Sequence, residues 1–156
     1  MTTTHKARDY QDDLSRGVRT HWSQGARNVL AVLPTGGGKS FVVAREVSDY
    51  QGAACVIAHR GELVTQLSTA LAREGVRHRV VGPDSLRRSI TAVHMEEFNR
   101  SYYDPGARVA VASVDSLVLM DPKDPWVRQV GMWVQDEAHH VLADNKWGKA
   151  CKLFPN

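Results

Sequence analysis

Residues 33–40 read Leu-Pro-Thr-Gly-Gly-Gly-Lys-Ser, between an apolar run and a stretch with helical periodicity. Three consecutive glycines let backbone N–H groups converge on phosphate oxygens, because no Cβ atom obstructs them. A helix that begins at Lys39 adds the positive end of its dipole at the same place. We therefore expect this loop to bind a nucleoside triphosphate through Thr35, Gly36, Gly37, Gly38, Lys39 and Ser40.

The last two residues of the loop have separate expected roles. Lys39 would reach the β- and γ-phosphates, and Ser40 would offer its hydroxyl to Mg²⁺. The strict phosphate-loop pattern has a glycine where this chain has Leu33, so the match to that pattern is incomplete. A flexible glycine turn is the alternative interpretation, but it does not account for Lys-Ser at a helix start.

Two adjacent acids follow a second apolar run, in Val134-Gln135-Asp136-Glu137. If that run is a parallel strand, its carboxyl end lies at the edge of the sheet where ligands bind. Asp136 would then hold Mg²⁺, and Glu137 would orient and deprotonate the attacking water. Together with Lys39, these acids predict a catalytic site for ATP hydrolysis. A metal site at His139 and His140 is the weaker interpretation, because adjacent histidines on a helix point in different directions.

Composition limits the other possibilities. A chain of 156 residues with 42% hydrophobic residues can form one domain with a real core. The net charge of +3 is only mild support for a polyanionic partner, and the arginines between residues 73 and 108 are typical of a solvated face. Cys55 lies in an apolar run and is expected to be buried. No run is long enough to span a membrane, and we expect a cytoplasmic protein.

The apolar periodicities alternate between strands and helices, which predicts an α/β fold with a doubly wound, mainly parallel sheet flanked by helices. Gly75 is expected to end one helix, and residues 120–125 to form a loop. The expected strands are 28–33, 53–58, 76–81, 108–112 and 132–135. The expected helices are 9–22, 39–50, 62–74 and 90–103.

The loop form Pro-Thr-Gly-x-Gly-Lys-Ser and the sequence Asp-Glu-Ala-His at 136–139 resemble the superfamily 2 DEAD/DEAH-box helicases. The sequences of these motifs are most similar to those of the DNA-repair helicases of bacteria and phages. The resemblance covers residues 1–156 as one N-terminal RecA-like domain. It implies ATP and Mg²⁺ as cofactors, and ATP hydrolysis coupled to movement on, or unwinding of, DNA, with RNA possible. It also implies that His139 couples the ATP site to neighbouring motifs.

Three further stretches are similar to motifs of this family, in the family order. Residues 8–11 resemble the Q-type motif, in which Gln11 would pair with adenine and either Arg8 or Tyr10 would stack on or support the base. A helix N-terminus capped by Asp9 is compatible with the same residues. Residues 57–66 resemble motif Ia, in which Arg60 would grip a phosphate. Residues 111–117 resemble motif Ib, in which Ser113 would touch the nucleic-acid backbone.

The family also has a second RecA-like domain, which is absent from these 156 residues. The resemblance implies that this domain, or a subunit like it, supplies an arginine to the γ-phosphate. Loss of such an arginine costs roughly 10³–10⁵ in rate in comparable sites. We therefore expect a fragment or half of a helicase with weak ATPase activity. A non-catalytic module that binds nucleic acid or protein remains the alternative, whereas a GTPase is disfavoured because no Asn-Lys-x-Asp motif occurs.

Overall fold

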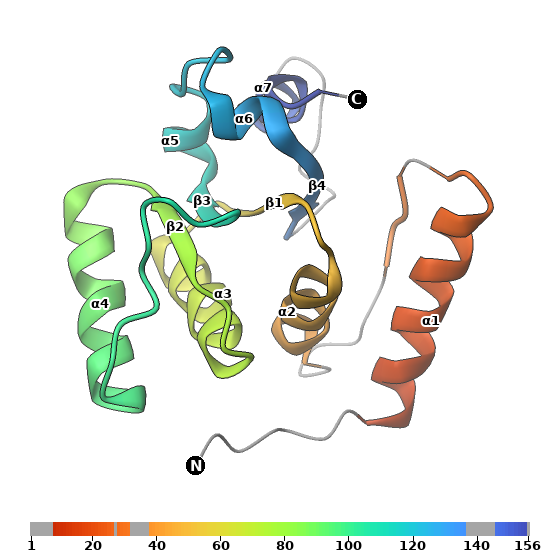
Figure 1. Cartoon of the computed structure of the whole chain (residues 1–156), viewed down its shortest axis with the longest axis horizontal. Coiled ribbons are helices and arrows are strands. Elements are labelled where there is room, and N and C mark those ends of the chain that lie inside the picture. The colour runs from red at the N-terminus through yellow and green to blue at the C-terminus, as the bar shows by residue number, and fades with distance from the viewer. Residues whose placement is uncertain (1–7, 27, 32–37, 137–145, 156) are drawn as a thin grey trace.

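A four-stranded parallel sheet forms the centre of the protein, in the strand order β2-β3-β1-β4. The computed structural model describes residues 8–26, 28–31, 38–136 and 146–155. The predicted doubly wound α/β class is confirmed, because helices cover both faces of this sheet (Figure 1). The strands are β1 (Ala53–Ala58), β2 (His78–Val81), β3 (Val109–Ser113) and β4 (Val130–Gln135).

Helices α2, α3 and α4 pack on one face of the sheet, and α5, α6 and α7 pack on the other. Helix α1 lies at the periphery beside α2 (Figure 1). The helices are α1 (Asp9–Ser23), α2 (Lys39–Asp49), α3 (Gly61–Arg73), α4 (Asp84–Phe98), α5 (Val114–Leu117), α6 (Pro125–Gln129) and α7 (Lys146–Leu153).

The continuous apolar run of β1 follows from its place between two helical layers. All six residues of the strand are buried. Successive side chains point to opposite faces, so Ala54 and Val56 join the core under α2 and α3. Cys55 and Ile57 join the core under α5, α6 and α7. Cys55 is fully buried as expected, and burial raises the pKa of its thiol.

Two of the expected elements differ in the structure. The strand expected over residues 28–33 is not formed at 28–31, which pair with none of the four strands, and Leu30 is 75% exposed. An apolar run becomes a strand only when a neighbouring strand satisfies its backbone groups. The helix expected at 90–103 begins earlier, at Asp84, and ends at Phe98. Asn99 stops it with a left-handed φ of 56°, which asparagine tolerates better than most residues.

Gly75 ends α3 as the sequence predicts. Its φ is 72°, in the left-handed region that favours glycine. The N–H of Val76 donates to the carbonyl of Leu71, and the N–H of Gly75 donates to that of Ala72. The predicted loop ends one residue earlier than expected, because Pro125 is the first residue of α6 and Asp124 caps that helix.

The arginines between residues 73 and 108 serve mostly to hold the fold. Arg108 donates to the carbonyls of Val47, Ser48 and Gly52, where α2 ends. Arg79 donates to the carbonyl of Ala107 and lies over the ring of Trp126. Arg79 and Arg108 are therefore half-buried and have a structural role, in place of the solvated positions that the sequence predicted for them.

A buried polar chain joins α3, β2 and α4. The backbone N–H of Tyr102 donates to Nδ1 of His94, so neutral His94 carries its proton on Nε2 and donates it to Ser68 Oγ. Ser68 in turn donates to Nε2 of His78, 2.6 Å away, and Nδ1–H of His78 donates to the carbonyl of Val76. All three side chains are buried. Burial lowers the pKa of His78 to about 4 and also lowers the pKa of His94.

Candidate nucleotide and nucleic-acid sites

Lys39 and Asp136 meet at the carboxyl edge of the sheet although 97 positions separate them in the sequence. Lys39 is the first residue of α2, and Asp136 directly follows β4. The distance from Lys39 Nζ to Asp136 Oδ1 is 2.9 Å, with the lysine 55% and the aspartate 19% exposed. The N–H of Asp136 donates to the carbonyl of Ile57 and continues the ladder between β1 and β4. Two of the residues predicted for the catalytic site are thus in direct contact.

The end of the glycine loop has the backbone geometry that glycine permits. Gly38 has a φ of 75° and immediately precedes α2, in which Ser40 is the second residue and is partly exposed. A Cβ atom at position 38 would lie 2.3 Å from Nε2 of Gln11. Glycine is favoured here by the backbone angle, and a Cβ at this position would also push the flexible end of Gln11 away.

That side chain comes from the stretch that resembles the Q-type motif. Gln11 is buried, and its Nε2 lies 3.4 Å from the carbonyl oxygen of Gly38. Its Oε1 accepts from the N–H of Arg8, which precedes α1, and the Arg8 side chain donates to the hydroxyl of Tyr10. Arg8, not Asp9, occupies the cap position of α1. The structure therefore brings Arg8, Gln11 and the end of the phosphate loop together.

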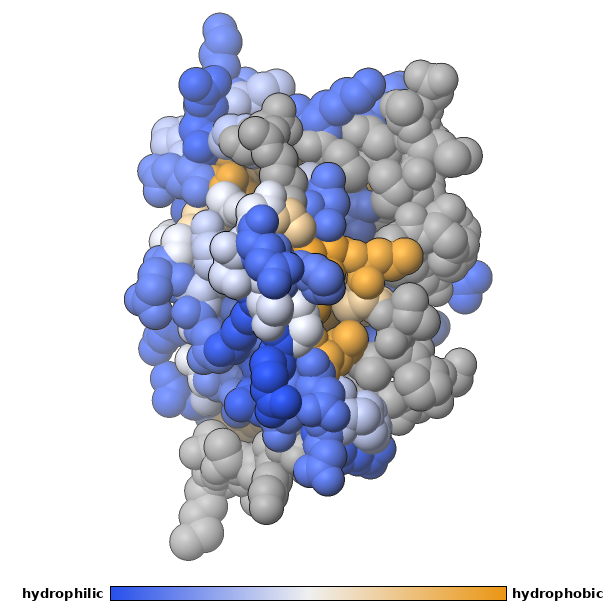
Figure 2. Space-filling model, turned by 90° about the vertical axis from the view of Figure 1, so that its right-hand side faces the viewer, coloured by the Kyte–Doolittle hydropathy of each residue, from blue (hydrophilic) through white to orange (hydrophobic). Residues whose placement is uncertain are grey.

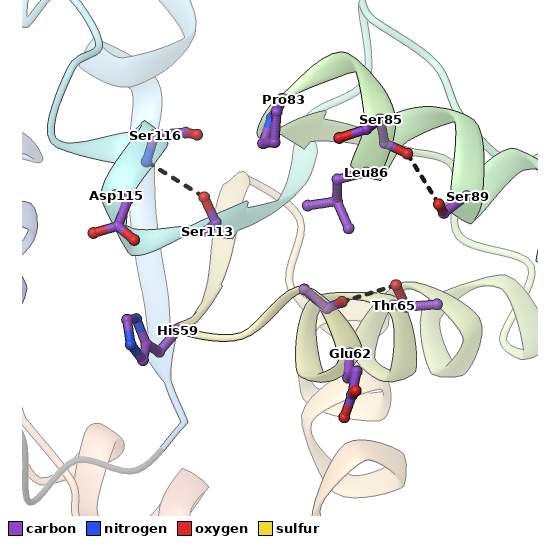
Figure 3. A pocket seen from close by; sticks show the side chains of 11 residues that line it. His59, Glu62, Thr65, Pro83, Ser85, Leu86, Ser89, Ser113, Asp115 and Ser116 are labelled. Carbon is purple, nitrogen blue, oxygen red and sulfur yellow. Dashed lines mark hydrogen bonds between the residues drawn. The ribbon is translucent and has the colours of Figure 1, made fainter.

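A separate open cavity of about 790 Å³ lies at the carboxyl edge of β1, β2 and β3. The first turns of α3 and α4 border it, and Ser113 borders it from the end of β3 (Figure 3). Helix N-termini favour anions. Ser113 accepts a hydrogen bond from the N–H of Ser116, 3.3 Å away, so part of its hydrogen-bonding capacity caps α5.

The cavity also includes residues to which the sequence analysis gave no binding role. Thr65, Ser85 and Ser89 supply hydroxyls, while Glu62 and Asp115 supply carboxylates (Figure 3). In the sequence these residues appear only as small or polar residues that follow an expected strand, and nothing there indicates that they share one cavity. Arg60 caps α3 and is exposed, but it is not among the residues that line the cavity.

Other predicted site residues lie outside the described part of the chain. These are Thr35, Gly36 and Gly37 of the loop, together with Glu137 and His139. Within the described residues, no group of three or more histidine, cysteine, aspartate or glutamate side chains could hold a metal ion by itself. No helix in the same part of the chain is long and apolar enough to cross a membrane.

Comparison with known proteins identifies the family of this chain. The family model described as "Type III restriction enzyme, res subunit" matches residues 4–156. No curated protein sequence matches the chain significantly.

Solved structures of one helicase have the same fold. A crystal structure of the UvsW helicase from bacteriophage T4 is similar with a TM-score of 0.62 and 20% identity, over 96% of this chain and 48% of that one. A second structure of T4 UvsW is similar with a TM-score of 0.65 and 18% identity, over 96% of this chain and 28% of that one. The chain thus spans about half or less of the solved chains that it matches.

The family model covers nearly the whole chain, and the helicase structures are similar in fold over 96% of it. The chain therefore belongs to the family described as the res subunit of type III restriction enzymes, and it is a RecA-like motor domain of the superfamily 2 helicase type.

Proposed function

We propose that this chain is the ATP-binding half of a DNA helicase or translocase, which couples ATP hydrolysis to movement on, or unwinding of, nucleic acid. The contact between Lys39 and Asp136 carries the proposal. It joins the end of a glycine loop to the acid after a parallel strand, at the sheet edge where nucleotides bind. Lys39 would bind the β- and γ-phosphates in place of its contact with Asp136.

The oxygen donors near this contact fit a magnesium ion. Asp136 offers a carboxylate and Ser40 a hydroxyl, and Mg²⁺ in nucleotide sites is commonly held by one or two such ligands together with phosphate oxygens. When bound, Mg²⁺ would neutralise charge on the phosphates. Glu137 would orient and deprotonate the attacking water, and His139 would couple this site to nucleic-acid binding. The second RecA-like domain would complete the site.

Nucleic acid would bind along the edge formed by the residues of motifs Ia and Ib. The first turns of α3 and α4 line the cavity that Ser113 borders, and Arg60 lies exposed at the start of α3. Contacts of this kind recognise the backbone rather than the bases, so we expect little sequence preference. We propose DNA rather than RNA as the substrate because of the resemblance to DNA-repair helicases. A cytoplasmic location is proposed on the basis of the same function.

The first experiment measures ATP binding and hydrolysis by the 156-residue chain, with single-stranded DNA, duplex DNA, RNA or no nucleic acid. We expect these 156 residues by themselves to bind ATP but to hydrolyse it poorly, because the resemblance implies that a second RecA-like domain supplies an arginine. Lys39→Ala should weaken ATP binding, whereas Lys123→Ala, an exposed lysine on the loop before α6, should leave it unchanged. Equal ATP affinity in the wild type and Lys39→Ala would place the nucleotide site elsewhere.

Hydrolysis and nucleic-acid binding have their own tests. Any turnover by the wild-type chain should disappear in Glu137→Gln, and strong turnover without another protein would contradict the need for a second domain. Arg60→Ala should weaken nucleic-acid binding and reduce its salt dependence. Arg77→Ala is the matched control. Arg77 is also exposed, but it directly precedes β2 and therefore lies at the amino end of that strand, away from the cavity at the carboxyl edge. Identical salt slopes for both variants would exclude Arg60 as a phosphate contact.

One observation favours a second candidate function. Glu62 and Asp115 place carboxylates in the cavity that we assign to nucleic acid, and carboxylates repel phosphates. A non-catalytic module that binds a protein partner would have no such conflict. Nucleotide binding without any nucleic-acid binding, even in an Asp115→Asn variant, would favour this candidate.

A further inference from the structure

Helix α1 is held to the rest of the protein mainly by polar contacts. Gln11 is its only buried residue, and Tyr10 and Trp22 are 39% and 37% exposed. Neither hydrophobic core of the described structure contains an α1 residue. In Figure 2, which views the side where α1 lies, most of the coloured residues are hydrophilic, and hydrophobic residues are exposed in places. The two hydrophobic cores therefore do not position this helix, although Leu14 and Val18 on it are half-buried.

Three ion pairs join α1 to α2. Arg19 Nε lies 3.1 Å from Glu46 Oε2, and the same guanidinium contacts Asp49. At the other end of α1, Asp12 lies 3.1 Å from Arg45. The Asp12–Arg45 pair is about half exposed, which makes such a pair worth little.

The contact of Arg19 with Glu46 differs because the carboxylate is buried. Glu46 is only 7% exposed, and its second oxygen, Oε1, has no hydrogen-bond partner among the described residues. Glu46 and Asp49 raise the pKa of Arg19 above its ordinary value, so the guanidinium remains charged throughout the accessible pH range. A buried carboxylate that loses its only cation is strongly destabilised. Arg19 thus has a larger energetic effect than its own exposure indicates.

The helix that Arg19 holds also carries Gln11. Eight positions separate the two residues, about 12 Å along a rigid helix. Gln11 reaches Gly38 at the end of the phosphate loop, and the contact is close enough that a Cβ at position 38 would collide with it. Movement of α1 away from α2 would therefore withdraw Gln11 from the nucleotide site.

We infer that Arg19 is a positioning residue for nucleotide binding: its ion pairs with Glu46 and Asp49 fix α1 on α2 and so keep Gln11 against the phosphate loop. The inference rests on the proposed function, since it assumes that a nucleotide binds beside Gly38. The apparent dissociation constant equals the intrinsic one divided by the fraction of molecules with α1 docked. Loss of the ion pairs lowers that fraction without removing any contact to the nucleotide.

The position of α1 is measured first, without nucleotide, by hydrogen exchange of its backbone amides. Arg19→Ala should reduce the protection of α1 and leave that of β1 and β3 unchanged. Arg16→Ala is the matched control, because Arg16 lies on the same helix and its ion pair among the described residues is with Asp13, one turn away on α1. In the wild type, protection of α1 should also fall between about 0.05 M and about 0.5 M salt, because salt screens ion pairs. Equal protection of α1 in the two arginine variants would overturn the inference.

Nucleotide affinity is measured next, by titration with ATP and GTP. Arg19→Ala should bind ATP roughly three- to tenfold more weakly and discriminate less against GTP. Arg19→Lys should recover part of the loss, and Arg16→Ala should behave like the wild type. If Arg19→Ala folds poorly, the double variant Arg19→Ala/Glu46→Gln removes the uncompensated buried charge and should still bind ATP weakly.

The outcomes separate the inference from the proposed function. ATP binding by the wild type with the same affinity in Arg19→Ala would overturn the inference alone. Failure of the wild type to bind ATP would overturn the proposed function, and with it the role of Arg19 in nucleotide binding.

Discussion

Acidification should destabilise the protein through His78, which lies buried between α3 and α4 in a chain of hydrogen bonds. In the neutral state, His94 donates to Ser68 and Ser68 donates to His78. A proton added at Nε2 of His78 would face the serine hydroxyl, and the serine proton would then have no acceptor. The protonated ring would also carry its positive charge in a buried position without hydration by water, which is unfavourable. Both effects favour the unfolded state, in which the imidazole is protonated freely.

The magnitude follows from the difference between the two pKa values. Burial lowers the pKa of His78 from 6.5 to about 4. Above pH 6.5 the ring is neutral in both states and stability does not depend on it. As the pH falls below 6.5, the unfolded state binds a proton first, so stability is lost until the pH passes about 4. One pKa unit corresponds to about 1.4 kcal/mol, so the free energy of unfolding falls by about 3 kcal/mol in total. About 2 kcal/mol of this decrease occurs between pH 7 and pH 5.

His94 adds to the effect in the same direction. Burial lowers its pKa, while Glu97 on the same helix opposes the shift. Glu97 also pairs with Arg73 of α3, which limits its influence.

The assay is the free energy of unfolding from urea titrations at several pH values between 5 and 7.5. The wild type should lose about 2 kcal/mol over this range, and His78→Gln, which cannot titrate, should lose much less. His21→Gln serves as the control, because His21 is exposed at the end of α1 and should leave the wild-type slope intact. The reasoning is refuted if His78→Gln retains the full pH dependence of the wild type.

Further substitutions test the backbone angle at Gly38 and the contacts that Arg108 makes with the end of α2. Gly38→Ala should cost about 1–2 kcal/mol of stability, because its φ of 75° is strained for alanine, and it should displace Gln11 and weaken ATP binding. Gly17→Ala, in the middle of α1 with open space around its Cβ, should be neutral or stabilising in the same urea titration, and equal effects at both glycines would argue against strain at Gly38. Arg108→Met should cost about 2 kcal/mol in thermal or urea unfolding, since it removes charged hydrogen bonds to the carbonyls at the end of α2. A loss below about 0.5 kcal/mol would mean that water replaces the guanidinium there.

The local elements with strong signals could be predicted from the sequence. The six buried residues of β1 were predicted to within a residue, because an apolar run of that length is stable only between two layers. Gly75 marked the end of α3 because only glycine adopts its backbone angle without strain. The region around α4 was less well predicted, since Pro83 and Asn99 set its bounds through capping and a left-handed turn rather than through apolar periodicity.

The residue types of the candidate site were also visible in the sequence, but their partners were not. The loop before Lys39 and the acid at Asp136 indicated phosphate and magnesium chemistry, because those groups require glycine, lysine and carboxylate at such positions. Only the parallel order of the strands brings these residues within 2.9 Å of each other.

Tertiary structure alone decided which charged and polar residues act as structural supports. Arg108 and Arg19 look like ordinary surface arginines in sequence, yet one binds carbonyls at the end of α2 and the other neutralises a buried glutamate. Ser68, His78 and His94 lie 10 to 26 positions apart and form one hydrogen-bonded chain in the core. Local sequence determines backbone preference and chemical type, whereas hydrogen bonds and ion pairs depend on distances that only the folded chain sets.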